Sequence, residues 1–277
     1  MEQQCIEQCI NEEYSVTLGL TADGELMLSG RDGRLENVNF CENYAGYYPA
    51  CRFTAIACKE GTFYAASIDT EGKPHLFASL MGRVWNETKL VDFHAKRQAS
   101  GKIVRILYEE EENQMYLICE DGTLITVPDC VRCIRIWQVT EKQVADGLLQ
   151  ERDIILCCKD GSQIRVPVSA ARQYRASAEY ITEQFAENGG YLVDFRHGQT
   201  GAAESVLREN LPQILHKAVR DGNGVYASIE FADFRGWLDD MSQATVIAFV
   251  CESGVLSDEA VLYARRQGWR KTYSVKI

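Results

Sequence analysis

The chain has 277 residues, of which 46% are hydrophobic and 25% are charged. This composition is typical of a globular protein and excludes a mostly disordered chain, which would be poorer in apolar residues. The net charge of −11 argues against the basic surface on which nucleic-acid binding depends, and it disfavours anionic membranes for the same reason. The longest apolar run, Val246 to Cys251, is too short to span a membrane. We therefore expect no nucleic-acid partner and no membrane partner.

The N-terminal sequence MEQQCIEQCINEE is acidic and lacks a basic-then-apolar signal pattern, so we expect a cytoplasmic protein. In a reducing compartment, cysteines are mostly small apolar residues of the interior. Many of the 11 cysteines lie inside apolar runs, and four of them are interpreted in this way: Cys58, Cys119, Cys157 and Cys158. Cys5 and Cys9 are interpreted as packing residues on one face of a short N-terminal helix.

Cys130 and Cys133 form a Cys-x-x-Cys pair. A zinc site would need a second pair of Cys or His at matching spacing, and the sequence has none. A redox dithiol would need a helix that starts after the first cysteine, whereas the surrounding residues are typical of strands. Since a glycine-rich phosphate loop is also missing from the sequence, we predict neither a metal site nor a cofactor.

Residues 1–169 have the pattern of an all-β domain. Apolar segments flank four turn pairs, Asp23-Gly24, Glu60-Gly61, Asp121-Gly122 and Asp160-Gly161. Such a pair predicts a hairpin with a type I′ turn, which needs positive φ at both central residues. The glycines are 37, 61 and 39 residues apart, which indicates repeats of about 40 residues, one of them with an insertion. A period of this size is typical of β-propeller blades.

The stretch YSVTLGLTADGELMLSGRDGRL resembles a repeat of the chromosome-condensation-regulator type. The stretch HLFASLMGRVW resembles the outer hairpin of related propeller blades. These resemblances imply a small or incomplete propeller that binds partners through its loops. A β-sandwich or an irregular barrel built from the same hairpins is the alternative fold for this half.

Residues 170–277 have a different pattern, so the protein is expected to be multidomain. Four short apolar segments predict strands, at 191–195, 224–229, 245–250 and 271–277. Helical spacing falls between them, at 176–190, 205–224, 231–240 and 257–268. Apolar strands that alternate with helices predict an α/β domain whose parallel sheet is covered on both faces.

The segment CESGVLS links the third of these strands to the last helix. Cys251 ends the strand, and Ser257 is expected to be the N-cap of the helix, with Asp258 and Glu259 in the first turn. In open parallel sheets, ligands bind beyond the carboxyl ends of the strands. A helix N-terminus there would stabilise a thiolate. We therefore expect Cys251 to be an exposed nucleophile and the most reactive cysteine of the chain.

From about residue 177 onward, the chain resembles the rhodanese family of sulfurtransferases. YLVDFR looks like the family's strand that ends in Asp-x-Arg, and GVYASIEFADFRGWLDD resembles the segment before the active strand. CESGVLS aligns with the family's active loop, here Cys251 followed by Glu252, Ser253, Gly254, Val255, Leu256 and Ser257. The resemblance implies that Cys251 takes a sulfane sulfur from a donor and passes it to an acceptor thiol. Loop N–H groups would then hold the persulfide.

The loop departs from the family at two positions where arginine is usual, which are Glu252 and Leu256 here. The loss of these cations should raise the thiol pKa and disfavour anionic donors. Asp194, Arg196 and His197 are expected to line the Cys251 site, with His197 as a candidate proton shuttle. Related phosphatases need an arginine where this chain has Ser257, which argues against phosphatase chemistry. The alternative function is a non-catalytic module in which a degenerate loop and a propeller-like surface bind a partner protein.

Overall fold

The computed structural model describes residues 4–30, 33–38, 52–93, 95–111, 113–128, 134–196 and 211–276. The chain divides into two compact units, Met1–Val166 and Pro167–Ile277. This division lies three residues before the boundary expected from the sequence, 169/170. The short 3₁₀-helix η2 (Val168–Tyr174) packs on α6 (Val255–Arg266) and therefore belongs to the second unit. No helix in the described ranges has both the length and the hydrophobicity that a membrane crossing requires.

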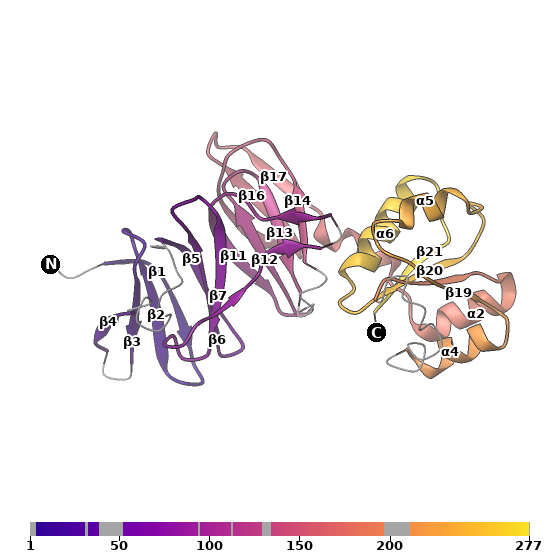
Figure 1. The fold of residues 1–277 in the computed structure, drawn as a ribbon, viewed down its shortest axis with the longest axis horizontal. Coiled ribbons are helices and arrows are strands. Elements are labelled where there is room, and N and C mark those ends of the chain that lie inside the picture. Colours follow the sequence, from indigo (N-terminus) through magenta and orange to yellow (C-terminus); the bar gives the residue numbers. More distant parts are fainter. Residues whose placement is uncertain are drawn as a thin grey trace. The chain divides into compact units, whose positions relative to one another are not determined.

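In its described residues, the first unit contains four larger antiparallel sheets, each a meander in which strands consecutive in the chain pair with one another (Figure 1). We number the sheets 1 to 4 in chain order. Sheet 1 contains β1 (Cys5–Asn11), β2 (Val16–Thr21), β3 (Leu26–Ser29) and β4 (Leu35–Asn37). Sheet 2 contains β5 (Arg52–Lys59), β6 (Thr62–Ile68), β7 (Pro74–Ser79) and β8 (Asn86–Thr88).

The chain then forms a two-stranded ribbon before it enters the last two sheets of this unit. The ribbon contains β9 (Val91–Asp92) and β10 (Arg97–Gln98). Sheet 3 contains β11 (Ile103–Glu109), β12 (Gln114–Cys119), β13 (Thr123–Val127) and β14 (Arg135–Gln138). Sheet 4 contains β15 (Val144–Gln150), β16 (Asp153–Cys158) and β17 (Gln163–Val166).

The first strands of the four sheets lie next to one another in chain order, β1 beside β5, β5 beside β11 and β11 beside β15. Meander sheets that meet at their first strands are the arrangement of propeller blades. The unit is therefore propeller-like, and the strands do not mix between sheets as they would in a β-sandwich or a barrel. The all-β prediction for this half is confirmed in this form.

Each first strand also carries a β-bulge at the same place. The register to the second strand shifts between Cys5 and Glu7 in sheet 1, and the bulged residue is Ile6. The corresponding extra residues in sheets 2, 3 and 4 are Thr54, Val104 and Ala145. A shared bulge shows that the four sheets are copies of one structural repeat. It also aligns the residue that follows the bulge in each sheet: Glu7, Ala55, Arg105 and Asp146.

A hairpin is present at each of the four predicted turn pairs, but one pair is not equivalent to the others. Glu60-Gly61 joins the first and second strands of its sheet, whereas the other three pairs join the second and third strands. The equivalent glycine of sheet 2 is Gly72, whose N–H donates to the Asp69 carbonyl at 3.1 Å. The equivalent glycines are therefore Gly24, Gly72, Gly122 and Gly161, with φ of +80° or +81°.

The repeat length is consequently longer and more even than the sequence pattern suggested, with glycine spacings of 48, 50 and 39 residues. The expected type I′ turn is also wrong in most cases. Of the four predicted pairs, all within the described residues, only Glu60-Gly61 has positive φ at both positions, +43° and +72°. In the other three pairs, only the glycine is left-handed. In each of these turns the glycine N–H donates to the carbonyl three residues earlier, as Gly24 does to Thr21.

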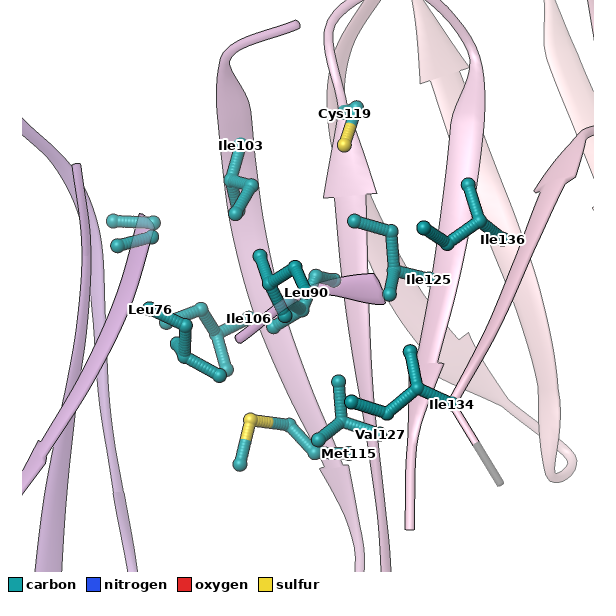
Figure 2. Packing of buried hydrophobic residues seen from close by; sticks show 13 residues of the cluster. Leu76, Leu90, Ile103, Ile106, Met115, Cys119, Ile125, Val127, Ile134 and Ile136 are labelled. Carbon is teal, nitrogen blue, oxygen red and sulfur yellow. The ribbon is translucent and has the colours of Figure 1, made fainter. Parts of the chain in front are cut away.

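Apolar side chains fill the space between neighbouring sheets. One cluster joins leucines of sheet 1, such as Leu18, to Phe63 and Phe77 of sheet 2. A second joins sheet 2 to sheet 3, and Figure 2 shows Leu76 beside Ile106 in it. The predicted burial of cysteines in apolar runs is confirmed for Cys119 and Cys158, while Cys58 and Cys157 are partly buried.

The second unit contains a parallel sheet of four strands in the order β19-β18-β20-β21. Its strands are β18 (Tyr191–Asp194), β19 (Val225–Ser228), β20 (Ile247–Cys251) and β21 (Thr272–Lys276). Besides η2 and α6, the helices in its described residues are α2 (Ala178–Asn188), α4 (Gln213–Arg220) and α5 (Phe234–Asp239). All four predicted strands are therefore present, with small differences at their ends.

The two faces of this sheet have different cores. The helices α2 and α4 lie on one face of the sheet, and α5 and α6 lie on the other (Figure 1). Leu192, Ala248 and Val250 pack against α2 and α4. Phe249 packs against Phe234 of α5, which in turn contacts α6. Covering on both faces was predicted, because the strands are apolar throughout. Of the helix expected over 205–224, the first six residues lie outside the described residues. The described part contains α4, which begins after Pro212, a residue that cannot donate a backbone hydrogen bond inside a helix.

Candidate functional site

Cys251 lies where the strand order of the parallel sheet reverses. From β18, the chain goes to β19 on one side and returns to β20 on the other side. Such a switch point opens a crevice at the carboxyl ends of the two central strands, which is where ligands bind in open α/β sheets. Cys251 is the last residue of β20 and pairs with Lys276 of β21.

The sulfur of Cys251 faces the N-terminus of α6. The Ser257 backbone N–H donates to Sγ at 3.4 Å, and the Leu256 backbone also hydrogen-bonds to the thiol. Cys251 Sγ lies 3.5 Å from Ser257 Oγ and donates to it. Ser257 Oγ is held in turn by the Gly254 carbonyl at 3.0 Å and by Ser274 Oγ at 2.9 Å. Two N–H groups at a helix N-terminus therefore converge on one sulfur atom.

The expected exposure of Cys251 is wrong, because its residue accessibility is 0%. Burial raises the pKa of the Cys251 thiol above 9.0, its ordinary value. The hydrogen bonds from Ser257 and Leu256 lower this pKa, and the charge of Asp258 raises it, but burial has the largest effect. The thiol is therefore protonated at neutral pH in this conformation.

The start of α6 also differs from the sequence prediction. Gly254 is the N-cap, with φ +81°, and the helix begins at Val255, so Ser257 is already inside the first turn. The helix starts early because Gly254 adopts the left-handed conformation that allows the chain to turn directly after the strand. Within the loop, Glu252 is exposed, whereas Leu256 is 1% exposed. An arginine at position 256 would therefore be buried.

Arg175 is a cation beside this loop that sequence reasoning missed. Its guanidinium binds the Asp258 carboxylate at 3.2 Å from Nε and 2.5 Å from Nη2. Nη2 also lies 3.8 Å from the position that a Cβ atom on Gly254 would occupy. Arg175 follows η2, and it pairs with Ser274 of β21 through a parallel β-bridge. Its distance from the loop in sequence left no local signal for this contact.

Asp194 and Arg196 form a pair of their own at the end of β18. The buried Asp194 carboxylate accepts from Arg196 Nη2 at 2.6 Å and from the Tyr226 hydroxyl at 3.1 Å. Although burial lowers the pKa of Arg196, Asp194 outweighs this effect, and Glu252 adds to the increase. Alternation along the strands puts Asp194 on the α2–α4 face and Cys251 on the α5–α6 face. Asp194 therefore lies on the side of the sheet opposite Cys251, whereas Arg196 is close enough to Glu252 of the Cys251 loop for the two charges to interact.

Three other predicted residues, His197, Cys130 and Cys133, lie outside the described residues. Cys5 and Cys9 are part of strand β1, so the expected N-terminal helix is wrong. Cys9 packs in the cluster between sheets 1 and 2 together with Cys58. Burial, with contributions from Cys58 and Glu7, raises the pKa of Cys9 to about 12.

A polar cluster that the sequence did not indicate lies next to the bulges of the first unit. Arg105 of sheet 3 binds Glu7 of sheet 1 at 2.7 Å and Asp146 of sheet 4 at 2.6 Å. Glu7 also accepts from the Ile56 N–H of sheet 2 at 3.2 Å. Residues next to the shared bulge thus connect all four sheets. Glu7, Arg105 and Asp146 hold the same position in their repeats, directly after the bulge, and this equivalence is recognised only after the sheets are aligned.

No protein-family model matches the chain, and no curated protein matches it. Among solved structures, it is similar to a computationally designed protein, Ika4, with 12% identity and a TM-score of 0.43 over 60% of this chain and 92% of the other. YCF48 bound to D1 peptide has 10% identity and a TM-score of 0.43, over 57% of this chain and 49% of that chain. YCF48 from Cyanidioschyzon merolae has 13% identity and a TM-score of 0.34, over 55% and 56%. Similarity at this level assigns no function.

Proposed function

We propose that the second unit is a rhodanese-like domain in which Cys251 carries a sulfane sulfur between a donor and an acceptor thiol. The observation that carries the proposal is the convergence of the Ser257 and Leu256 backbone N–H groups on Sγ at the start of α6. Such donors stabilise a negative sulfur, whether it belongs to a thiolate or to a persulfide. The resemblance of CESGVLS to the family's active loop supports the same assignment.

In the proposed cycle, the Cys251 thiolate attacks the sulfane sulfur of the donor. A new S–S bond forms while the donor's bond to that sulfur breaks, and the donor leaves with the electron pair. An acceptor thiolate then attacks the outer sulfur of the persulfide and releases the Cys251 thiolate. Sulfur moves without an external oxidant or reductant, and each thiol gives up its proton to solvent before it attacks.

Because Cys251 is fully buried, the first step requires the Glu252–Gly254 loop to move. The loop is only three residues long, and it ends at Gly254, whose left-handed backbone is easily accessible to glycine. Movement of the loop would expose Sγ and remove the largest cause of its raised pKa. The reaction is therefore expected to be slow with free donors and faster with a partner that opens the loop.

The second candidate function is a non-catalytic protein-interaction module. It is favoured by the complete burial of Cys251 and by Glu252 and Leu256 at the positions where the family usually has arginine. In this case the thiol is a packing residue, and its hydrogen bonds to α6 stabilise the fold only.

The two functions are separated by mass spectrometry of the intact chain after incubation with thiosulfate or inorganic polysulfide. The sulfur-carrier function predicts the gain of one sulfur on the Cys251 peptide and its loss when a thiol acceptor is added. The Cys251→Ser variant should gain no sulfur on that peptide, and Cys157, which is partly exposed, serves as the internal control for non-specific persulfide formation. If Cys157 gains sulfur while Cys251 does not, the interaction module is the correct function.

A further inference from the structure

Sheets 1 and 4, the first and last of the propeller-like unit, expose apolar side chains on their first strands. On β1 of sheet 1, Ile6 is 68% exposed and Ile10 is 62% exposed. On β15 of sheet 4, Leu148 is 44% exposed. These residues lie on the first strands, which elsewhere in the unit form the contacts between sheets. Such positions are expected to be covered in a finished array of sheets.

The shared bulge defines which residues are equivalent in the four sheets. Counting from the residue after the bulge, Leu148 corresponds to Cys9, Ala57 and Leu107 of the earlier sheets. Cys9 packs in the cluster between sheets 1 and 2, and Ala57 in the cluster between sheets 2 and 3. Residues of this position therefore face the following sheet.

The next position has the opposite orientation. Ile10 corresponds to Cys58, Tyr108 and Leu149. Cys58 packs in the cluster that sheet 2 shares with sheet 1, and the Tyr108 ring lies under Lys59 Nζ of sheet 2, 4.5 Å from its centroid. Residues of this position therefore face the preceding sheet. Cys9 and Cys58 are partly buried, as are Ala57 and Tyr108, whereas Ile10 and Leu148 are exposed.

Ile10 and Leu148 are thus the two halves of one more junction of the same kind. Sheet 1 presents the surface that packs on a preceding sheet, and sheet 4 presents the surface that packs on a following sheet. Their high exposure shows that the sheets of one chain do not bring these two surfaces together. A surface that fits each of them exists on a second copy of this chain.

We propose that two copies associate through these faces, sheet 4 of each packing against sheet 1 of the other. The result is a closed ring of eight sheets with twofold symmetry, which is within the range of four to eight blades known for propellers. Ile10 of one copy would contact Leu148 of the other at both junctions. A twofold arrangement satisfies both ends at once and leaves no face for further growth. This proposal does not depend on the function of Cys251.

The test is the oligomeric state of the full chain, measured by sedimentation velocity over a wide range of concentrations. A dimer is expected, and it should become tighter as salt is added, because two chains of net charge −11 repel each other and an apolar interface has no ion pairs to screen. The Ile10→Lys and Leu148→Lys variants should each raise Kd by at least about tenfold. Val225→Lys, at an equally exposed apolar residue of the second unit, should leave it unchanged.

A charge pair tests whether the two faces meet. The double variant Ile10→Glu with Leu148→Lys should recover the dimer at low salt, whereas Ile10→Lys with Leu148→Lys should not. Circular dichroism and thermal unfolding confirm that each variant is folded. A wild-type chain that stays monomeric at all concentrations would overturn the proposal. So would a dimer that responds to Ile10→Lys but not to Leu148→Lys, because the interface would then be sheet 1 against sheet 1.

Discussion

Arg175 holds Asp258 with two of its guanidinium nitrogens, Nε at 3.2 Å and Nη2 at 2.5 Å. Asp258 lies in the first turn of α6, the same turn whose Ser257 N–H donates to the sulfur of Cys251. Both side chains of the pair are less than a fifth exposed, at 19% and 14%. The ion pair therefore joins the segment before α2 to the structure around the thiol.

Replacing Arg175 by alanine should destabilise the start of α6. The variant leaves Asp258 largely buried without its partner, and such a loss costs about 1–3 kcal/mol. Hydrogen exchange of the full chain should show faster exchange in peptides from 255–266 and little change in peptides from sheets 1 to 4. Arg175→Lys is the matched control, because it keeps the charge but cannot form the two-nitrogen contact.

The Asp258→Asn variant should lower the pKa of Cys251, because the charge of Asp258 raises that pKa in the wild type. Alkylation by iodoacetamide at increasing pH, followed on the Cys251 peptide, measures the change. In the wild type, Cys251 should label later than Cys157, because Cys251 is buried, and low urea concentrations should accelerate its labelling. Rapid labelling of native Cys251 before Cys157 would contradict the burial described above.

Asp194→Asn should destabilise the second unit by about 3–5 kcal/mol, because it removes the charge that compensates Arg196, whose side chain is 6% exposed. Tyr226→Phe removes only one neutral donor to the same carboxylate and should cost about 1 kcal/mol. Urea unfolding of both variants measures the difference. Equal effects would mean that the Asp194–Arg196 pair contributes little.

Two glycines of the repeated turn provide a matched pair for the propeller-like unit. Gly122 and Gly161 both have φ +81°, so alanine at either position should cost about 1–2 kcal/mol. A Cβ on Gly122 would also lie 2.2 Å from the Thr140 carbonyl oxygen, whereas nothing lies within 4 Å of one on Gly161. Gly122→Ala should therefore lower the free energy of unfolding clearly more than Gly161→Ala.

His75 makes the stability of sheet 2 depend on pH. Its ring nitrogens contact Glu87 Oε1 at 2.7 Å and Asp69 Oδ2 at 3.0 Å. Burial lowers the pKa of His75, but these two carboxylates outweigh it and raise the pKa above 6.5. The protonated form is thus favoured by folding. Its contribution should be complete below pH 6.5 and disappear as the pH rises through the raised pKa.

Unfolding free energies of wild type and His75→Gln, measured across this range, test the effect. The difference between the two proteins should shrink with increasing pH. A difference that grows instead would show that His75 is neutral in the folded protein.

Local patterns in the sequence predicted the hairpins and the parallel strands, because both depend on neighbouring residues. The register of the repeats was not predictable, since Gly61 and Gly72 both follow a glutamate and only pairing distinguishes their turns. At the candidate site, the apolar run before Cys251 located the end of β20. The burial of its sulfur depends on α6 and β21, and the Arg175–Asp258 contact spans 83 residues. No local pattern contains such information.

The bulges of β1, β5, β11 and β15 determine which changes of length the repeats tolerate. The turn glycines are 48, 50 and 39 residues apart, so length varies freely elsewhere in the repeat. Deleting the extra residue of a first strand, such as Val104, would leave its neighbours paired as before but remove the bend and the added twist that the bulge gives the strand. Among natural variants, insertions and deletions should therefore accumulate in the later strands of each sheet and in the connections, while the first strands keep their length.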